Sequence, residues 1–237
     1  MTHLKGEKRA AYVQQMFGRI AHRYDLLNRL ITLGQDVRWR RFLIKKMAIG
    51  QNSTVLDLGA GTGDLALEMK QQHPDALVVA GDFTPEMLLV GKQRGGADRI
   101  HWVIADAMNL PFASSCADVV VSGFLLRNVP DVDKTLAEQH RALKPGGRAG
   151  SVDTTPLRNN WLRPFLQFHL HTVIPFLGQL IAGDAEAYTY LPDSTEQFLT
   201  AEKLAATFEN AGFKSVGFVR RMLGTVGIHW GKKGNSG

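Results

Sequence analysis

Short apolar runs alternate with helical patterns along most of this chain, from residue 53 to residue 152. The helical patterns, in which apolar residues recur every three or four positions, cover about residues 63–72, 85–94 and 132–143. The apolar runs predict strands at residues 53–58, 77–82, 100–105, 118–122 and 148–152. Because repeated strand–helix units fold into parallel sheets with helices on both faces, this region predicts a doubly wound α/β core.

The two ends of the chain carry different patterns. Residues 1–50 predict an N-terminal helical cap with a break at Leu33-Gly34. Residues 156–200 are apolar, aromatic and helical, and we expect an inserted helical lid over the site. The chain is thus predicted as a single domain, 1–237, with a Rossmann-like, mostly parallel, seven-stranded sheet. Its remaining parts are a ligand-binding core at 51–155 and a C-terminal part at 201–237, with a helix at 201–210 and closing strands at 214–221 and 224–230.

Composition and charge bear on the binding partners and the cellular location of the protein. The net charge of +6 permits a nucleic acid or an anionic membrane as partner without requiring either. The single cysteine, Cys116, cannot form a disulfide within the chain and fits a reducing compartment. The N-terminus lacks an apolar signal segment, and no apolar run reaches the roughly 18 residues of a membrane span. We therefore expect a cytoplasmic protein. Peripheral contact with the inner face of the membrane and homo-oligomerisation both stay open.

One predicted helix, at residues 35–47, is both basic and amphipathic. Trp39, Phe42, Leu43 and Met47 lie on one side of it, and arginines and lysines occupy the remainder. Such a helix can lie on anionic lipid, or it can pack its apolar side against the core of its own domain.

The first predicted strand is followed by glycines at alternate positions, Gly59, Gly61 and Gly63. Glycine lets the backbone approach a ligand closely, because it has no Cβ. The dinucleotide fingerprint G-x-G-x-x-G is absent, since Asp64 stands where its last glycine should be. The spacing G-x-G-x-G suits a ligand with an amino-acid tail and a nucleoside but no pyrophosphate, such as S-adenosylmethionine (SAM). A purely structural turn is the alternative.

Acidic residues after the next two strands fit the same ligand. Asp82 stands 19 positions after the last glycine of the turn, where a carboxylate can accept hydrogen bonds from ribose hydroxyls. Its alternative role is to cap the helix that follows Thr84. Asp106 and Ala107 stand where the amino group of adenine could be read, and Thr62 and nearby backbone amides would hold the amino-acid tail.

These features together resemble the class I SAM-dependent methyltransferases, which also carry stretches like those at residues 81–88, 105–112 and 143–148. Further stretches are similar to the ubiquinone/menaquinone biosynthesis C-methyltransferase family. They are Arg23-Tyr24-Asp25-Leu26-Leu27-Asn28, Leu126-Arg127-Asn128-Val129, residues 183–192 and Ala211-Gly212-Phe213.

The resemblance implies transfer of a methyl group from SAM, as cosubstrate, to a ring carbon of a polyprenylated hydroquinone. Three positions depart from the family pattern. Gly123 stands where the family has a serine, Leu125 replaces a glycine, and Asp153-Thr154-Thr155-Pro156 replaces Glu-Phe-Ser-Lys-Pro. The expected SAM site comprises Gly59, Gly61, Thr62, Gly63, Asp82, Asp106, Ala107 and Gly123.

Arg127 and Asn128 are the residues expected to assist the reaction. A hydroquinone ring is a carbon nucleophile once a hydroxyl proton is lost, so a cation that stabilises the phenolate would speed the transfer. We predict that Arg127 is this cation, acting directly or through water, and that Asn128 orients it. Alternatively, Arg127 forms a structural ion pair with Asp131 or Asp133. No metal site is predicted, and the reserve candidates are His169, His171, Tyr188 and Asp153.

Other functions fit less well or stay open. Methyltransferases that act on base amino groups typically carry Asp/Asn-Pro-Pro-aromatic after the fourth strand, whereas residues 123–128 read Gly-Phe-Leu-Leu-Arg-Asn. We therefore expect no nucleic-acid partner. Another small apolar acceptor and a non-catalytic SAM-binding protein stay open. Among quinols, we expect demethylmenaquinol ahead of the ubiquinone precursor 2-methoxy-6-polyprenyl-1,4-benzoquinol, because it is the more widespread bacterial substrate of the family.

Overall fold

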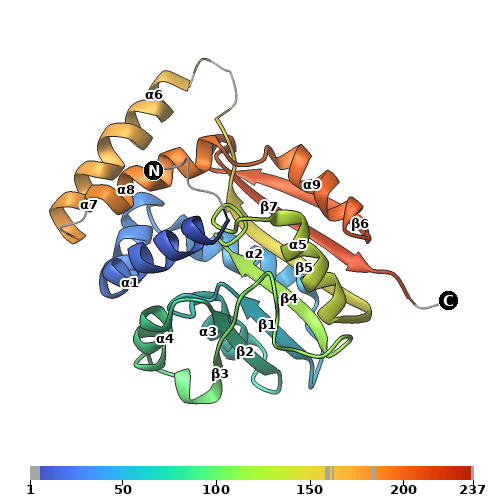
Figure 1. The fold of residues 1–237 in the computed structure, drawn as a ribbon. Coiled ribbons are helices and arrows are strands. Elements are labelled where there is room, and N and C mark those ends of the chain that lie inside the picture. Colours follow the sequence, from blue (N-terminus) through green and yellow to red (C-terminus); the bar gives the residue numbers. More distant parts are fainter. Residues whose placement is uncertain (1–5, 158–160, 162, 183–184, 236–237) are drawn as a thin grey trace.

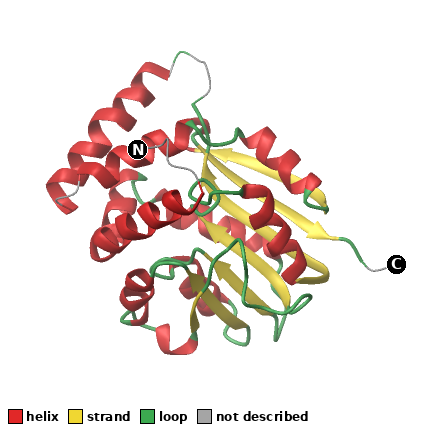
Figure 2. Cartoon of the chain, in the orientation of Figure 1, coloured by secondary structure: helices red, strands yellow, loops and turns green. Residues whose placement is uncertain are grey.

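The computed structural model describes residues 6–157, 161, 163–182 and 185–235. Its centre is a seven-stranded sheet with the strand order β3-β2-β1-β4-β5-β7-β6 (Figures 1 and 2). Neighbouring strands are parallel except at β7, which is antiparallel to β5 and β6. The predicted fold class is therefore confirmed. The strands are β1 (Thr54–Leu58), β2 (Leu77–Asp82), β3 (His101–Ile104), β4 (Ala117–Gly123), β5 (Leu143–Thr154), β6 (Phe213–Arg221) and β7 (Val226–Lys233).

The helices lie around this sheet (Figure 1). Three short helical segments are η1 (Ala97–Arg99), the π-helical η2 (His169–Val173) and η3 (Met222–Gly224). The α-helices are α1 (Gly6–Ile31), α2 (Gln35–Met47), α3 (Asp64–Gln72), α4 (Pro85–Lys92), α5 (Val132–Ala142), α6 (Arg163–Phe168), α7 (Ile174–Ala182), α8 (Ala185–Glu196) and α9 (Ala201–Asn210).

Two hydrophobic clusters cover the two faces of the sheet. On one face, α2 and α3 bury Leu43 and Met69 against strand residues such as Val55. On the other face, α5 and α9 bury Leu136 and Phe208 against their own set of strand side chains. Successive strand side chains point to opposite faces, so a strand covered on both faces must be apolar throughout. This explains the continuous apolar runs in the sequence.

The packing of α2 settles which interpretation of residues 35–47 holds. Trp39, Leu43 and Met47 are buried, and α2 contacts β5 and β7. A Cβ added at Gly150 of β5 would lie 2.6 Å from the Leu43 side chain and 2.7 Å from that of Met47. Glycine at this position therefore lets the helix approach the sheet closely. The apolar side of α2 packs against its own domain.

The carboxyl ends of β1, β2 and β4 meet at the point where the strand order reverses. The chain moves from β1 outward to β3 and then returns to β4 on the other side of β1. Ligands of doubly wound sheets bind in the crevice at such a switch point. The predicted SAM-binding residues follow these strands and β3, so they gather at one edge of the sheet.

β5 begins earlier than the sequence predicted. Residue 143 was expected to end the preceding helix and residues 144–147 to form a turn before the strand, but all of them belong to β5. The pairing shows why, since Ala117 pairs with Leu143 and Val119 with Arg148. Residues 144–147 therefore lie opposite a single residue of β4, Asp118, with Gly146 at φ 78°. The expected turn is thus an irregularity inside a longer strand.

Within the region 156–200, the described residues 163–182 and 185–196 form helices, as the pattern predicted. The segments α6, η2 and α7 follow one another without a gap, and α7 packs against α1 and α8 (Figure 1). Gly183 and Asp184 of the family-like stretch lie outside the described residues. Among the described residues, no helix has the length and apolar character needed to cross a membrane.

Candidate functional site

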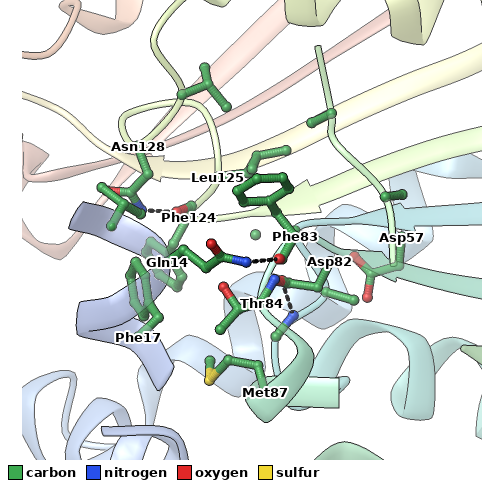
Figure 3. A pocket seen from close by; sticks show the side chains of 18 of the residues that line it. Gln14, Phe17, Asp57, Asp82, Phe83, Thr84, Met87, Phe124, Leu125 and Asn128 are labelled. Atoms are coloured by element: carbon green, nitrogen blue, oxygen red, sulfur yellow. Dashed lines mark hydrogen bonds between the residues drawn. The ribbon is translucent and has the colours of Figure 1, made fainter. Parts of the chain in front are cut away.

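A cavity lies at the carboxyl ends of β1, β2 and β4, and α1 forms its other wall (Figure 3). It encloses about 1060 Å³ of empty space, including the part that is open to solvent. Gln14 and Phe17 of α1 face Asp82, the last residue of β2, and Phe83, which follows it (Figure 3). The wall at the strand ends, which we call the polar wall, presents carboxylates and backbone groups, although apolar side chains such as Met87 and Leu125 also line it, and the wall on α1 is largely apolar.

The glycine turn forms one side of this cavity. Gly59, Gly61 and Gly63 have φ of 62°, 57° and 85°, the left-handed region in which residues with a side chain are strained. Gly59 and Gly61 line the cavity, and so does Thr62. Gly63 does not, although it was predicted as a SAM contact. It precedes α3, and a Cβ there would lie 2.4 Å from the Trp102 ring, so its described contacts are structural.

Asp82 lies deep in the cavity at the end of β2. Its Oδ2 accepts a hydrogen bond from the Gly61 N–H at 2.7 Å, and its Oδ1 accepts one from the Thr84 N–H at 2.7 Å. Burial raises the pKa of the Asp82 carboxyl, while the hydrogen bonds from Thr84 and Gly61 act in the opposite direction. Each oxygen can accept further bonds, so the carboxylate is held rigidly and is still available to a ligand.

Asp57, in β1, is a cavity residue that the sequence reasoning missed. Its Oδ2 accepts a hydrogen bond from the Ala66 N–H at 3.0 Å, whereas its Oδ1 is buried without a partner among the described residues. Burial raises the pKa of this carboxyl to about 8. An acid inside a strand that should otherwise be apolar was the signal that could have identified it.

Asp57→Asn should remove a pH dependence from the stability of the protein. The folded-state pKa of about 8 lies above the ordinary 3.8, so the carboxyl stabilises the fold fully at low pH. That contribution is lost as the pH rises toward about 8, by up to about 1.4 kcal/mol per pH unit. Urea unfolding at a series of pH values should show the wild type losing stability relative to the variant. A stability difference independent of pH would contradict a buried, protonated Asp57.

Thr62 is clamped between α1 and the end of α4. Its hydroxyl donates a hydrogen bond to Asp25 Oδ1 at 2.6 Å, and Arg94 Nη1 donates one to its backbone carbonyl at 3.0 Å. Arg94 also forms an ion pair with Asp25 at 3.2 Å. Because Asp25 belongs to the family-like stretch at residues 23–28, that stretch serves here to hold α1 onto the glycine turn.

An arginine cluster extends this clamp. Asp64, the first residue of α3, contacts Arg94 at 2.8 Å, Arg29 at 2.9 Å and Arg40 at 3.3 Å. Burial alone would raise the pKa of Asp64, but the three guanidinium groups outweigh it and hold that pKa below its usual value. Asp36 forms ion pairs with Arg29 and Arg40. The helices α1, α2 and α3 are thus joined beside the turn.

The loops after β3 and β4 supply the remaining predicted SAM contacts. Asp106, Ala107 and Gly123 all line the cavity. Asp106 Oδ1 accepts a hydrogen bond from the Met108 N–H at 2.8 Å, which shapes its loop. Ser122, beside the position where the family has a serine, is fully buried and does not line the cavity.

Leu125, which replaces the family's glycine, covers part of the turn. A Cβ added at Gly59 would lie 2.7 Å from Leu125 Cδ1, so the two residues are in direct contact. Leu125 lines the cavity together with Phe124, whose backbone has φ of 59° (Figure 3). The substitution therefore places an apolar side chain in the cavity wall.

Arg127 is buried and paired with Asp153. Its Nη1 donates a hydrogen bond to Asp153 Oδ1 at 2.8 Å, and its backbone N–H donates one to Asp153 Oδ2 at 3.2 Å. Neither residue lines the cavity. The structural tie expected as an alternative does exist, but with Asp153 instead of Asp131 or Asp133. Asp131 accepts a hydrogen bond from the Lys134 N–H and caps α5.

The charge of Arg127 nevertheless acts on the cavity. Its guanidinium carbon lies 5.1 Å from the centroid of the Phe124 ring, which lines the cavity. Tyr24 lines it too, and burial raises the pKa of this phenol while Arg127 is the main opposing influence. Asn128 lines the cavity and donates its amide hydrogen to the Phe124 carbonyl at 2.8 Å. Phe124 and Asn128 therefore separate Arg127 from the empty space.

The other candidates lie elsewhere. His171 forms an ion pair with Glu196 at 3.0 Å, and neither His169 nor His171 lines the cavity. The side chain of Tyr188 lies outside the described residues. In the part of the chain that the structure describes, no group of three or more His, Cys, Asp and Glu side chains could hold a metal ion. None of the described residues from 161 to 200 lines the cavity, so a lid function stays a prediction.

Comparison with known proteins finds a family match over nearly the whole chain. The model of the ubiE/COQ5 methyltransferase family matches residues 1–233. The chain is 49% identical to the ubiquinone/menaquinone biosynthesis C-methyltransferase UbiE of Desulfotalea psychrophila, covering 93% of this chain and 90% of that protein. It is 40% identical to the demethylmenaquinone methyltransferase of Thermus thermophilus, covering 92% of this chain and all of that protein.

Solved structures share the fold at low sequence identity. A SAM-dependent methyltransferase from Thermotoga maritima has a TM-score of 0.67 at 17% identity, covering 93% of this chain and 99% of that chain. The [4+2]-cyclase SpnF has a TM-score of 0.68 at 15% identity, covering 94% and 96%. Since one of these two is named for a cyclisation, the fold alone does not determine the reaction.

Proposed function

Because this chain belongs to the ubiE/COQ5 methyltransferase family, we propose that it methylates demethylmenaquinol to menaquinol. The chain is a SAM-dependent C-methyltransferase of respiratory quinone biosynthesis. Support for the menaquinone branch comes from relatives named demethylmenaquinone methyltransferase at 40%, 37% and 38% identity. The alternative acceptor is 2-methoxy-6-polyprenyl-1,4-benzoquinol.

The observation that carries this proposal is the division of one cavity into a polar and an apolar wall. On the polar wall, the Asp82 carboxylate would accept hydrogen bonds from the ribose hydroxyls of SAM. Asp57 Oδ1, which has no partner among the described residues, would accept a hydrogen bond from the ammonium group of SAM. Asp106, Ala107 and Gly123 would surround the adenine. The apolar wall on α1 would hold the quinol.

The reaction needs little chemistry from the protein. The ring carbon attacks the sulfonium methyl group, a C–C bond forms, and the S–CH₃ bond breaks to leave S-adenosylhomocysteine. The ring carbon then loses its proton to solvent or to a base. Positioning contributes most, because the carbon must lie in line about 3–3.5 Å from the methyl group.

Arg127 would favour the phenolate form of the substrate from behind the cavity wall. Burial raises the pKa of the Tyr24 phenol, and the charge of Arg127 is the main influence that opposes this rise. A quinol hydroxyl in the same cavity would experience the same charge. Asn128 would orient the substrate at the wall. Arg127 and Asn128, expected from the sequence to assist the reaction, thus remain our candidates.

The acceptor also implies a place of action. A polyprenyl tail partitions into lipid, because each buried CH₂ group contributes about 0.8 kcal/mol. We therefore expect the enzyme to collect its substrate at a membrane surface.

Turnover with both acceptors tests the choice of substrate. Purified protein, SAM and each chemically reduced precursor are combined at equal tail length, and kcat/KM is measured from labelled SAM. We expect kcat/KM for the naphthoquinol to be higher by at least about tenfold. A pocket can distinguish substrates that differ by one methylene group by about this factor, and the two acceptors differ by a whole ring. Preference for the benzoquinol would overturn the choice of menaquinone, and turnover of neither would overturn the proposed acceptor class.

A further inference from the structure

The helical segments α6, η2 and α7 form an arm that projects away from the sheet (Figure 1). Its inner side is used for packing, because Ile174 is buried in a cluster with Met16, Ile20 and Leu27 of α1. Its outer side carries large apolar side chains that are between 63% and 70% exposed. We call these residues the outer stripe: Phe165, Phe168, Phe176 and Leu180.

The spacing of the outer stripe places it along one side of the arm. Phe165, Phe168, Phe176 and Leu180 are separated by three, eight and four positions, with exposed Thr172 in the middle of the longest interval. Such intervals are those of one helical face. An exposed apolar patch of this kind marks a surface that binds a protein or a membrane.

Charge distinguishes between these two partners. The sequence from 161 to 182 contains Arg163 but no aspartate or glutamate. Of the helices against which α7 packs, α1 carries five lysines and arginines and two acidic residues, whereas α8 carries three acidic residues and no lysine or arginine. The arm itself therefore differs from its neighbours in having no acidic residue, and an aromatic helical face of this kind is typical of segments that lie in the interface of a bilayer.

We propose that the outer stripe inserts into the surface of a lipid bilayer and docks the enzyme there. This proposal rests on the proposed function, because the enzyme needs to reach a bilayer only if the tail of its acceptor is lipid-soluble. It replaces α2 as the candidate membrane contact, because the apolar side of α2 is buried against the sheet.

The arm is also connected to the cavity. Val13 and Phe17 of α1 line the cavity, and both pack in the cluster that contains Ile174 of α7. An apolar wall thus continues from the cavity through α1 to the inner side of the arm. Lipid bound at the outer stripe would lie one helix layer away from the wall that we assign to the quinol.

Vesicle flotation tests this proposal with the variant Phe168→Glu/Phe176→Glu. Two exposed aromatic residues are replaced by charged ones, so the fold should be unaffected while insertion into lipid becomes unfavourable. Partitioning onto vesicles of phosphatidylcholine and phosphatidylglycerol should fall by about tenfold or more relative to the wild type. The matched control is Leu89→Glu on α4, which changes a leucine that is 59% exposed and lies outside the stripe.

Two further measurements separate the outcomes. Both variants should methylate a short-chain, water-soluble quinol at the wild-type rate. Vesicle binding that is absent in the wild type, or equal in the wild type and the double variant, would overturn the proposal. Light scattering without lipid that shows a dimer lost in the double variant would overturn it too, in favour of a contact between copies. A wild type that binds vesicles but methylates no quinol would instead overturn the proposed function.

Discussion

Asp82→Asn should lower the affinity for SAM by about 100-fold or more. The carboxylate holds the Gly61 and Thr84 N–H groups at 2.7 Å and, in our proposal, also accepts the ribose hydroxyls. Hydrogen bonds to a charged group contribute about 1.5–3 kcal/mol each, and the buried amide would leave at least one donor unpaired. Isothermal titration calorimetry with SAM measures the change directly.

Asp75→Asn is the matched control for this experiment. Asp75 is exposed and lies near the start of the same strand, β2, far from its carboxyl end. We expect wild-type affinity and enthalpy from this variant. Equal SAM binding by wild type and Asp82→Asn, with both folded by circular dichroism, would refute the role of Asp82.

Removing the positive charge of Arg127 should abolish most turnover while leaving SAM binding within about threefold of the wild type. Electrostatic groups of this kind typically contribute about 10²–10³ to kcat. Arg127→Met alone is a poor test, because it leaves Asp153 buried without its cation, which typically costs about 3–5 kcal/mol. The informative variant is therefore Arg127→Met/Asp153→Asn.

The double variant keeps one acceptor oxygen at position 153, whereas the backbone N–H groups of Arg127 and Thr154 bond to different oxygens of Asp153, so one of these two hydrogen bonds is lost. Because no buried charge is left unpaired, the variant should regain part of the stability that the single variant loses, without regaining activity. Its residual rate should rise more steeply with pH than that of the wild type, because the quinol must then ionise without help. Wild-type turnover in a folded double variant would show that the pair is only structural.

The pattern of apolar residues predicted the sheet well because each strand lies between two covered faces. The order of strands and helices followed from the alternation, and Asp82 was found because its distance from the glycine turn is characteristic. The start of β5 was missed because Pro145 and Gly146 are turn residues, and only the pairing with β4 shows that they interrupt a strand.

Long-range partners could not be predicted in the same way. The pairing of Arg127 with Asp153 joins residues 26 positions apart, and the nearer acids at 131 and 133 were the obvious partners from sequence. The clamp between Asp25, Thr62 and Arg94 likewise depends on where α1 crosses the turn. The pattern of residues 156–200 predicted an apolar helical lid over the site, but it could not reveal which side of α7 is buried against α1.

The destination of the methyl group tests the central claim most directly. Protein, SAM labelled with ¹³C in its methyl group, and reduced demethylmenaquinol are incubated, and the product is analysed by NMR. We expect a labelled methyl carbon bonded to the quinone ring, formed together with an equal amount of S-adenosylhomocysteine. Label on a ring oxygen, or no transfer by a protein that binds SAM, would contradict it.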